Sequence, residues 1–167
     1  MNKPWLSQYG DVPAEININQ FASIAAIYED AFTRYANRPL AMSMEKTLSY
    51  AEVKAYSDQV GAWLQQRGLQ KGDRVAVMMP NCLQYVVVVA AILRAGFCVV
   101  NVNPLYTTDE LEHQLKDSGA KAIFILDHFA VTLEHALPHL PEMKHIVVSK
   151  MGDFLGFKWR IVDFVLK

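Results

Sequence analysis

Five histidines are the side chains of this sequence that most readily suggest chemistry, because imidazole binds metal ions and exchanges protons near neutral pH. His135 and His139 are four residues apart, a spacing that places two metal ligands on one face of a helix. Pro138 lies between them and disturbs that helix, and no HExxH motif or neighbouring cysteine completes a site. We therefore predict no metal site and interpret the histidines as solvated polar residues: His113, His128, His135, His139 and His145.

Other catalytic patterns are also missing. No GxSxG elbow makes any serine of the chain a nucleophile. The acidic residues Glu110, Glu112 and Asp117 fit helix caps or an exposed helix face better than a general acid–base pair. The phosphate-binding patterns GxGxxG and GxxxxGKS/T are absent as well. The sequence therefore predicts no catalytic residue.

Two proline-containing loops remain as candidates for ligand binding. Met79-Pro80-Asn81 follows one predicted strand, and Asn103-Pro104-Leu105-Tyr106 follows the next. Ligands of open parallel sheets bind beyond the carboxyl ends of the strands, and both loops lead into helix N-termini, which favour anions. Neither loop contains a glycine that would let the backbone approach a phosphate closely. Asn81 and Asn103 are therefore candidate cofactor contacts. In the alternative interpretation, Asn81 caps its helix and Asn103-Pro104 ends its strand.

The elements that position these loops alternate between strand and helix. Ser49 with Glu52, and Thr107 with Glu110, have the spacing of capping boxes that begin helices. Short connections between parallel strands require right-handed crossovers and place helices on both faces of the sheet. We predict an α/β fold with a doubly wound, mostly parallel sheet in three layers. The predicted parallel strands are 75–79, 97–102, 122–126 and 146–149, after a pair of short strands at 40–44 and 47–50.

The segment after Asn81 gives conflicting signals. Its YVVVV run favours a strand, because β-branched side chains lose rotamer freedom in a helix. About fourteen residues separate Asn81 from Gly96, which is too long for an ordinary strand. We predict a helix that is apolar on nearly all sides and therefore packs against the sheet.

Composition limits the partners and the compartment. Sixteen basic and seventeen acidic residues give a net charge of −1, so we expect no nucleic-acid partner. Cys82 and Cys98 lack CxxC spacing and lie among apolar residues, so both are predicted to be small buried residues of a reducing compartment. Residues 1–13 lack an apolar signal core, and the longest apolar run, 85–93, is far shorter than the ~20 residues that span a bilayer. We expect a cytoplasmic protein with at most peripheral membrane contact.

Two long segments resemble a known family. LSYAEVKAYSDQVGAWLQQRGLQKGDRVAVMMPN (48–81) is similar to the first core motif of the AMP-forming acyl/aryl-CoA ligases, the adenylating superfamily. ILRAGFCVVNVNPLYTTDELEHQLKDSGAKAIF (92–124) resembles the second core motif. Within that superfamily, residues 100–120 and the N-terminal residues 4–41 resemble bacterial long-chain fatty acyl-CoA synthetases.

The resemblance implies a ligase that uses ATP, Mg²⁺ and CoA. Such enzymes join a fatty acid to ATP as an acyl-adenylate, release pyrophosphate, and transfer the acyl group to CoA. The motifs that carry this chemistry do not occur in the sequence: a Thr/Ser/Gly-rich loop ending in Lys-Gly, Tyr-Gly-x-Thr-Glu, a ribose-binding aspartate and a C-terminal lysine. The chain therefore resembles an amino-terminal fragment, 1–150 being an α/β subdomain, and we expect it to be inactive alone.

Residues 151–167 form a predicted amphipathic tail. Wound as a helix, the tail places Gly156, Arg160, Asp163 and Lys167 on one side. Such a face suits either a membrane interface or packing against the rest of an enzyme. Both interpretations remain open at this stage. The residues of the predicted membrane or packing face are Phe154, Phe157, Trp159, Ile161, Phe164 and Val165.

Two other functions remain open. The chain is alternatively a non-catalytic binding or homodimerisation module, because an exposed apolar tail favours self-association. Among enzymes, the alternative is a ligase for medium-chain or aromatic acids.

Overall fold

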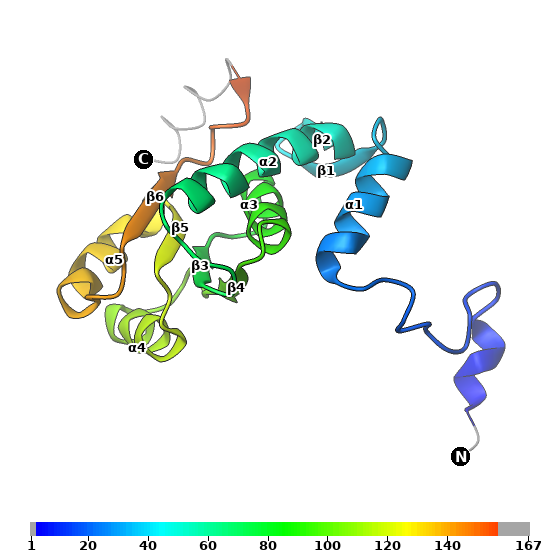
Figure 1. Ribbon diagram of the computed structural model, residues 1–167, viewed down its shortest axis with the longest axis horizontal. Coiled ribbons are helices and arrows are strands. Elements are labelled where there is room, and N and C mark those ends of the chain that lie inside the picture. Colours follow the sequence, from blue (N-terminus) through cyan, green and yellow to red (C-terminus); the bar gives the residue numbers. More distant parts are fainter. Residues whose placement is uncertain (1–2, 157–167) are drawn as a thin grey trace.

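The chain alternates helices and strands from α1 onwards. A computed structural model describes residues 3–156 (Figure 1). Three short 3₁₀ turns, η1 (Pro4–Gln8), η2 (Asp127–Phe129) and η3 (Leu137–His139), accompany the longer elements. Those elements are α1 (Ile24–Arg34), β1 (Pro39–Ser43), β2 (Lys46–Ser49), α2 (Tyr50–Gln66), β3 (Arg74–Met78), α3 (Leu83–Arg94), β4 (Cys98–Asn101), α4 (Thr108–Ser118), β5 (Ala122–Leu126), α5 (Ala130–Ala136) and β6 (His145–Ser149).

The main sheet has four parallel strands in the order β4-β3-β5-β6. Val75 of β3 aligns with Val99 of β4 on one side and with Ala122 of β5 on the other. The chain moves outward from β3 to β4 and then returns across β3 to β5, so the winding direction reverses between β3 and β5. This reversal is the topological switch point of a doubly wound sheet. The predicted fold class is confirmed.

Helices cover both faces of this sheet (Figure 1). On one face, α2 and α3 bury Leu64 and Ile92 against Val75 and Val77. On the other, α4 and α5 contribute to a second cluster around Ile123 and Ile125. Both clusters are almost entirely apolar, so burial of the strands on both faces explains the continuous apolar runs in the sequence.

A further layer of structure, which the sequence analysis did not predict, lies outside α2 and α3. It consists of α1 and the antiparallel hairpin β1–β2. Phe32 of α1 and Leu48 of β2 are buried against Val53 of α2 and Val87 of α3. The layer explains why α3 is apolar on nearly all sides, since it contacts the sheet on one side and this layer on the other.

Both predicted capping boxes are confirmed. The backbone N–H of Glu52 donates to Ser49 Oγ at 3.2 Å, and the N–H of Ser49 donates to Glu52 Oε2 at 2.8 Å. Thr107 and Glu110 repeat this exchange at 3.4 and 2.9 Å. These reciprocal bonds satisfy amides that the first helical turn leaves without intrahelical partners, and they define where α2 and α4 begin.

Two predictions about single residues were wrong. The N-cap of α3 is Cys82 and not Asn81, and its side chain makes no capping hydrogen bond. Cys98 is exposed, because it begins β4, a strand with a neighbour on one side only. Cys82 is buried as expected, and the valine-rich segment is helical as predicted, since tertiary burial outweighs its strand preference.

Candidate functional site

The two candidate loops lie at the carboxyl ends of neighbouring strands but in different surroundings. Asn81 lines a pocket of about 310 Å³ together with Ser43 of the hairpin and Tyr85 of α3. Asn103 lies in the turn that leads to α4, where its Oδ1 accepts the N–H of Leu105 at 3.0 Å. Asn81 therefore borders a cavity, whereas the Oδ1 of Asn103 is already hydrogen-bonded within its own turn.

Polar contacts connect the elements around this edge of the sheet. Tyr85 Oη donates to Asn101 Oδ1 at 3.1 Å, and Gln114 Nε2 donates to the Asn101 carbonyl at 2.9 Å. Burial raises the pKa of the Cys82 thiol above its ordinary value, although the amides of Tyr85 and Gln84 oppose this. A protonated thiol is a poor nucleophile, so Cys82 has the properties of a core residue.

The switch point carries two polar residues that the sequence analysis did not select. Asp127 and His128 follow β5 directly, beside the end of β3. His128 Nδ1 lies 2.8 Å from Asp127 Oδ1, yet the contact lacks hydrogen-bond geometry and this buried oxygen has no acceptable donor. The signal was available in the sequence, because these are the first polar residues after the apolar run 122–126.

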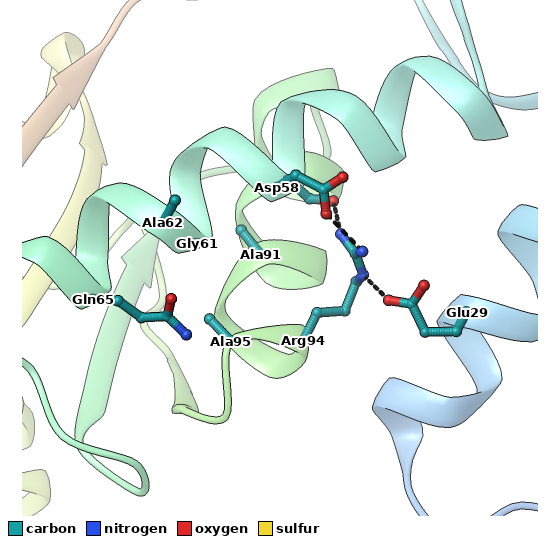
Figure 2. Close-up of a pocket in the computed structure, with 9 residues that line it drawn as sticks. Glu29, Asp58, Gly61, Ala62, Gln65, Ala91, Arg94 and Ala95 are labelled. Carbon is teal, nitrogen blue, oxygen red and sulfur yellow. Dashed lines mark hydrogen bonds and ion pairs between the residues drawn. The ribbon is translucent and has the colours of Figure 1, made fainter.

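A second polar cluster surrounds Arg94, at a pocket of about 190 Å³ between α1, α2 and α3 (Figure 2). Arg94 Nε donates to Glu29 Oε1 at 2.7 Å, and Nη2 lies 2.7 Å from Asp58 Oδ1. Nη1 donates to Ser57 Oγ at 2.6 Å, while the guanidinium carbon lies 5.0 Å from the centre of the Phe32 ring. One side chain therefore joins three helices.

Arg94 and Asp58 of this cluster keep their charges near neutral pH. Burial opposes the charged form of Arg94, but the hydrogen bonds that it donates to Glu29 and Asp58 raise its pKa above the ordinary value. Burial alone would raise the pKa of Asp58. Hydrogen bonds from Lys54 and Arg94 have the larger combined effect, so the pKa of Asp58 lies below its ordinary value. Groups held so firmly in one protonation state do not transfer protons near neutral pH, and we interpret the cluster as structural.

The close approach of α2 and α3 depends on Gly61. A Cβ atom at this position would lie 3.2 Å from the Cβ of Ala95, which is tighter than ordinary contact. The absence of a side chain therefore brings α2 close enough for Ser57 and Asp58 to reach Arg94 (Figure 2).

Two hydrogen bonds and one aromatic contact fix the residues that follow β6. The buried amide of Gln84 donates to the carbonyls of Lys150 and Met151 at 2.6 and 3.2 Å. Beyond them, the ring of Phe154 packs edge-on against Tyr56 of α2, with 5.1 Å between ring centres. Of the predicted apolar tail face, Phe154 is placed here; Phe157, Trp159, Ile161, Phe164 and Val165 lie outside the described residues.

The histidines are dispersed over the fold. His139 Nδ1 lies 2.7 Å from Glu112 Oε2, and His145 Nε2 lies 3.2 Å from the carbonyl of Arg67 at the end of α2. Within residues 3–156, no three His, Cys, Asp or Glu side chains gather as a metal site would require. In the same range, no helix has the length and apolar content needed to cross a bilayer.

The family model of the AMP-binding enzymes matches residues 28–161. The chain therefore belongs to the AMP-binding enzyme family. Its fold is similar to that of the anthranilate CoA ligase AuaEII in complex with anthranoyl-AMP, with a TM-score of 0.74 and 25% identity over 83% of this chain and 27% of that one. A long-chain-fatty-acid CoA ligase structure from Rhodopseudomonas palustris, described as putative, has a TM-score of 0.73 and 21% identity over 78% and 33%.

Curated relatives have higher sequence identity to this chain than these solved structures do. The chain is 49% identical to a long-chain-fatty-acid–CoA ligase of Salmonella typhimurium over 170 residues, which cover 100% of this chain and 30% of the relative. A Bacillus subtilis protein of the same name is 35% identical over 96% of this chain and 28% of that protein. The chain thus spans about 30% of the length of the curated relatives it matches.

Proposed function

We propose that this chain is the amino-terminal part of a long-chain fatty acid–CoA ligase. The observation that carries the proposal is the 49% identity to such a ligase over the whole chain. The Bacillus subtilis protein of the same name, at 35% identity over 96% of this chain, supports the same substrate class.

The proposed reaction has two steps. The fatty acid carboxylate attacks the α-phosphorus of ATP, forming an acyl-adenylate and releasing pyrophosphate. The CoA thiol, losing its proton, then attacks the acyl carbonyl and expels AMP. Mg²⁺ would neutralise charge on the phosphates during the first step. The chain's contribution in this proposal is structural: the buried sheet and its two helical layers support the segments that bind ATP and CoA.

A direct assay tests the proposal. The purified 167-residue chain is incubated with ATP, Mg²⁺, CoA and a C16 or C18 fatty acid, and pyrophosphate and acyl-CoA are measured. We expect no product, because the motifs that carry the chemistry are absent from the sequence. The complete gene product recovered with an antibody against this chain is assayed in parallel, and we expect long-chain acyl-CoA. Product from the isolated chain would contradict the first expectation.

The same antibody distinguishes the alternatives. A native protein much heavier than 18.9 kDa is expected for a ligase. A native protein of 18.9 kDa would instead indicate the standalone binding module, and preferential activation of benzoate or octanoate would indicate a ligase for aromatic or medium-chain acids.

A further inference from the structure

A short segment, residues 150–156, carries the chain from β6 toward α3 and α2, and we call it the exit strap. The paired register of β5 and β6 ends at Leu126 with Ser149, so the strap lies beyond the sheet. Asp153 Oδ2 accepts the Ser149 hydroxyl at 2.7 Å and the Lys150 N–H at 2.8 Å. Local bonds of this kind fold the strap into a turn of its own, separate from the strand ladder.

The side chain of Gln84 holds this turn against α3. Its amide donates to the carbonyls of Lys150 and Met151 at 2.6 and 3.2 Å, and only 4% of Gln84 is exposed. A buried amide without acceptors is costly, so the burial of Gln84 depends on a closed strap. Phe154 adds an edge-on contact with Tyr56 of α2, with 5.1 Å between ring centres. Side chains of two helices therefore fasten the strap.

The closed strap covers part of the apolar core at the start of α3. Cys82, the N-cap of α3, is 4% exposed and belongs to the apolar cluster against which Met151 packs. Gly152 of the strap is buried as well. Lifting the strap would therefore uncover this end of the cluster, with the thiol of Cys82.

We propose that the exit strap opens while the sheet stays folded, and that Gln84 is the side chain that keeps it closed. Opening breaks side-chain contacts and a local turn, and it leaves the ladders of the main sheet intact. Segments held in this way open at a lower free energy than the sheet that they leave. An open strap lets the chain after Gly156 leave the sheet in a new direction. The strap is thus a hinge at the exit from the α/β unit, whatever reaction the complete protein catalyses.

Labelling of Cys82 with N-ethylmaleimide tests the opening. Cys98 is exposed and would react first, so the full chain carries Cys98→Ser. When the strap closes faster than the thiol reacts, the labelling rate reports the fraction of open molecules. We expect this rate to change little with urea below the unfolding transition, because opening the strap exposes little surface. A rate that rises as steeply as the global unfolding equilibrium would overturn the proposal.

Two substitutions in the same background weaken the closed strap. Gln84→Met removes the hydrogen-bond donor and keeps a side chain of similar size, and we expect labelling of Cys82 to become about tenfold faster. Phe154→Ala should act in the same direction, because it removes the aromatic contact with α2. The urea series on the Cys98→Ser chain does not depend on the stability of either variant.

The matched control is Gln114→Met on α4. Gln114 Nε2 donates to the carbonyl of Asn101 at 2.9 Å, so this substitution removes the same kind of bond far from the strap in sequence. It should leave the labelling rate unchanged, and equal acceleration by both Gln→Met substitutions would overturn the proposal. A rate that neither strap variant changes would also overturn it, because the reagent would then enter through the pocket that Cys82 lines with Asn81.

Discussion

The two helical layers are attached to the sheet by different kinds of contact. Between α2 and α3, buried polar groups accompany the apolar core: Ser57 is 1% exposed, Gln84 is 4% exposed, and Arg94 joins three helices. Between α4, α5 and the sheet, the buried residues are apolar, and ion pairs such as Glu112 with His139 lie at the rim. Arg94 and Gln84 reach elements distant in sequence, namely α1 and the exit from β6.

This difference indicates that the two layers have different roles, one in stabilising the fold and the other in orienting neighbouring segments. Apolar burial is favourable in many arrangements, so it holds a layer against the sheet without requiring one geometry. A buried guanidinium or amide is costly unless its particular partners are present. We infer that the α4–α5 layer contributes mainly stability. The polar groups of the α2–α3 layer set where α1 and residues 150–154 are placed.

Leu111→Ala should give the largest loss of stability. Leu111 of α4 is fully buried, and truncating such a side chain removes apolar contacts and leaves a cavity, which costs about 3 kcal/mol. Urea unfolding followed by circular dichroism measures the free energy. Leu105→Ala is the control, because Leu105 is 84% exposed and its loss should cost less than about 0.5 kcal/mol. Similar values for both variants would contradict an apolar basis for the α4 contact.

Arg94→Met should have a smaller global effect and a larger local one. It removes the hydrogen bonds to Glu29, Asp58 and Ser57, and we expect a loss of about 2 kcal/mol. The expected loss of unfolding free energy is smaller than for a fully buried ion pair, because the side chains of Glu29 and Asp58 are 53% and 47% exposed. Hydrogen exchange should accelerate in α1 while α4 keeps its protection.

The matched control is Arg34→Met. Arg34 pairs with Asp30 on the surface of α1, where such a pair is worth less than about 0.5 kcal/mol. If hydrogen exchange in α1 responds equally to both substitutions, Arg94 does not orient that helix.

Asp73→Asn should give the smallest effect, visible as a change in pH dependence. Asp73 precedes β3 and accepts hydrogen bonds from Lys121 Nζ at 2.7 Å and the Gln70 N–H at 2.8 Å. These bonds, the one from Lys121 first, lower the pKa of Asp73 below its ordinary value. Loss of the carboxylate should cost about 1 kcal/mol at pH 7.

The sign of the pH effect follows from the lowered pKa of Asp73. Its stabilising contribution is complete above the unfolded-state pKa of about 3.9 and disappears as the pH falls through the lower folded-state value. Urea unfolding between pH 7 and pH 3 should therefore show a shallower acid loss for Asp73→Asn than for the parent chain. Parallel curves would show that the contact with Lys121 contributes nothing to acid sensitivity.

Local signals in the sequence predicted most elements of the fold. Ser49 with Glu52 and Thr107 with Glu110 are three residues apart, so their side chains and amides meet whenever a helix begins there. Helix α3 was predicted despite its valines, because length and burial outweigh rotamer preference. The cap was misplaced by one residue, since the backbone of Cys82 and not the side chain of Asn81 begins that helix.

Contacts between distant residues were not predictable in this way. Glu29, Asp58 and Arg94 come from three helices and share no periodic spacing, so nothing in the sequence indicates their convergence. Asp127 and His128 become candidate site residues only when the strand order is known, because that order places the switch point between β3 and β5. The exposure of Cys98 likewise depends on β4 being an edge strand, which follows from strand order and not from local sequence.

The bond from Gln84 to Lys150 has a consequence for the timing of synthesis. Its donor and acceptor are 66 residues apart, so the acceptor leaves the ribosome well after α3. At roughly 5–20 residues per second, several seconds separate the two events. During that interval the side-chain amide of Gln84 lacks its carbonyl acceptors and must stay hydrated. The first turn of α3 therefore cannot yet be fully buried. The segment that follows β6 therefore completes the hydrogen bonding of a helix made well before it.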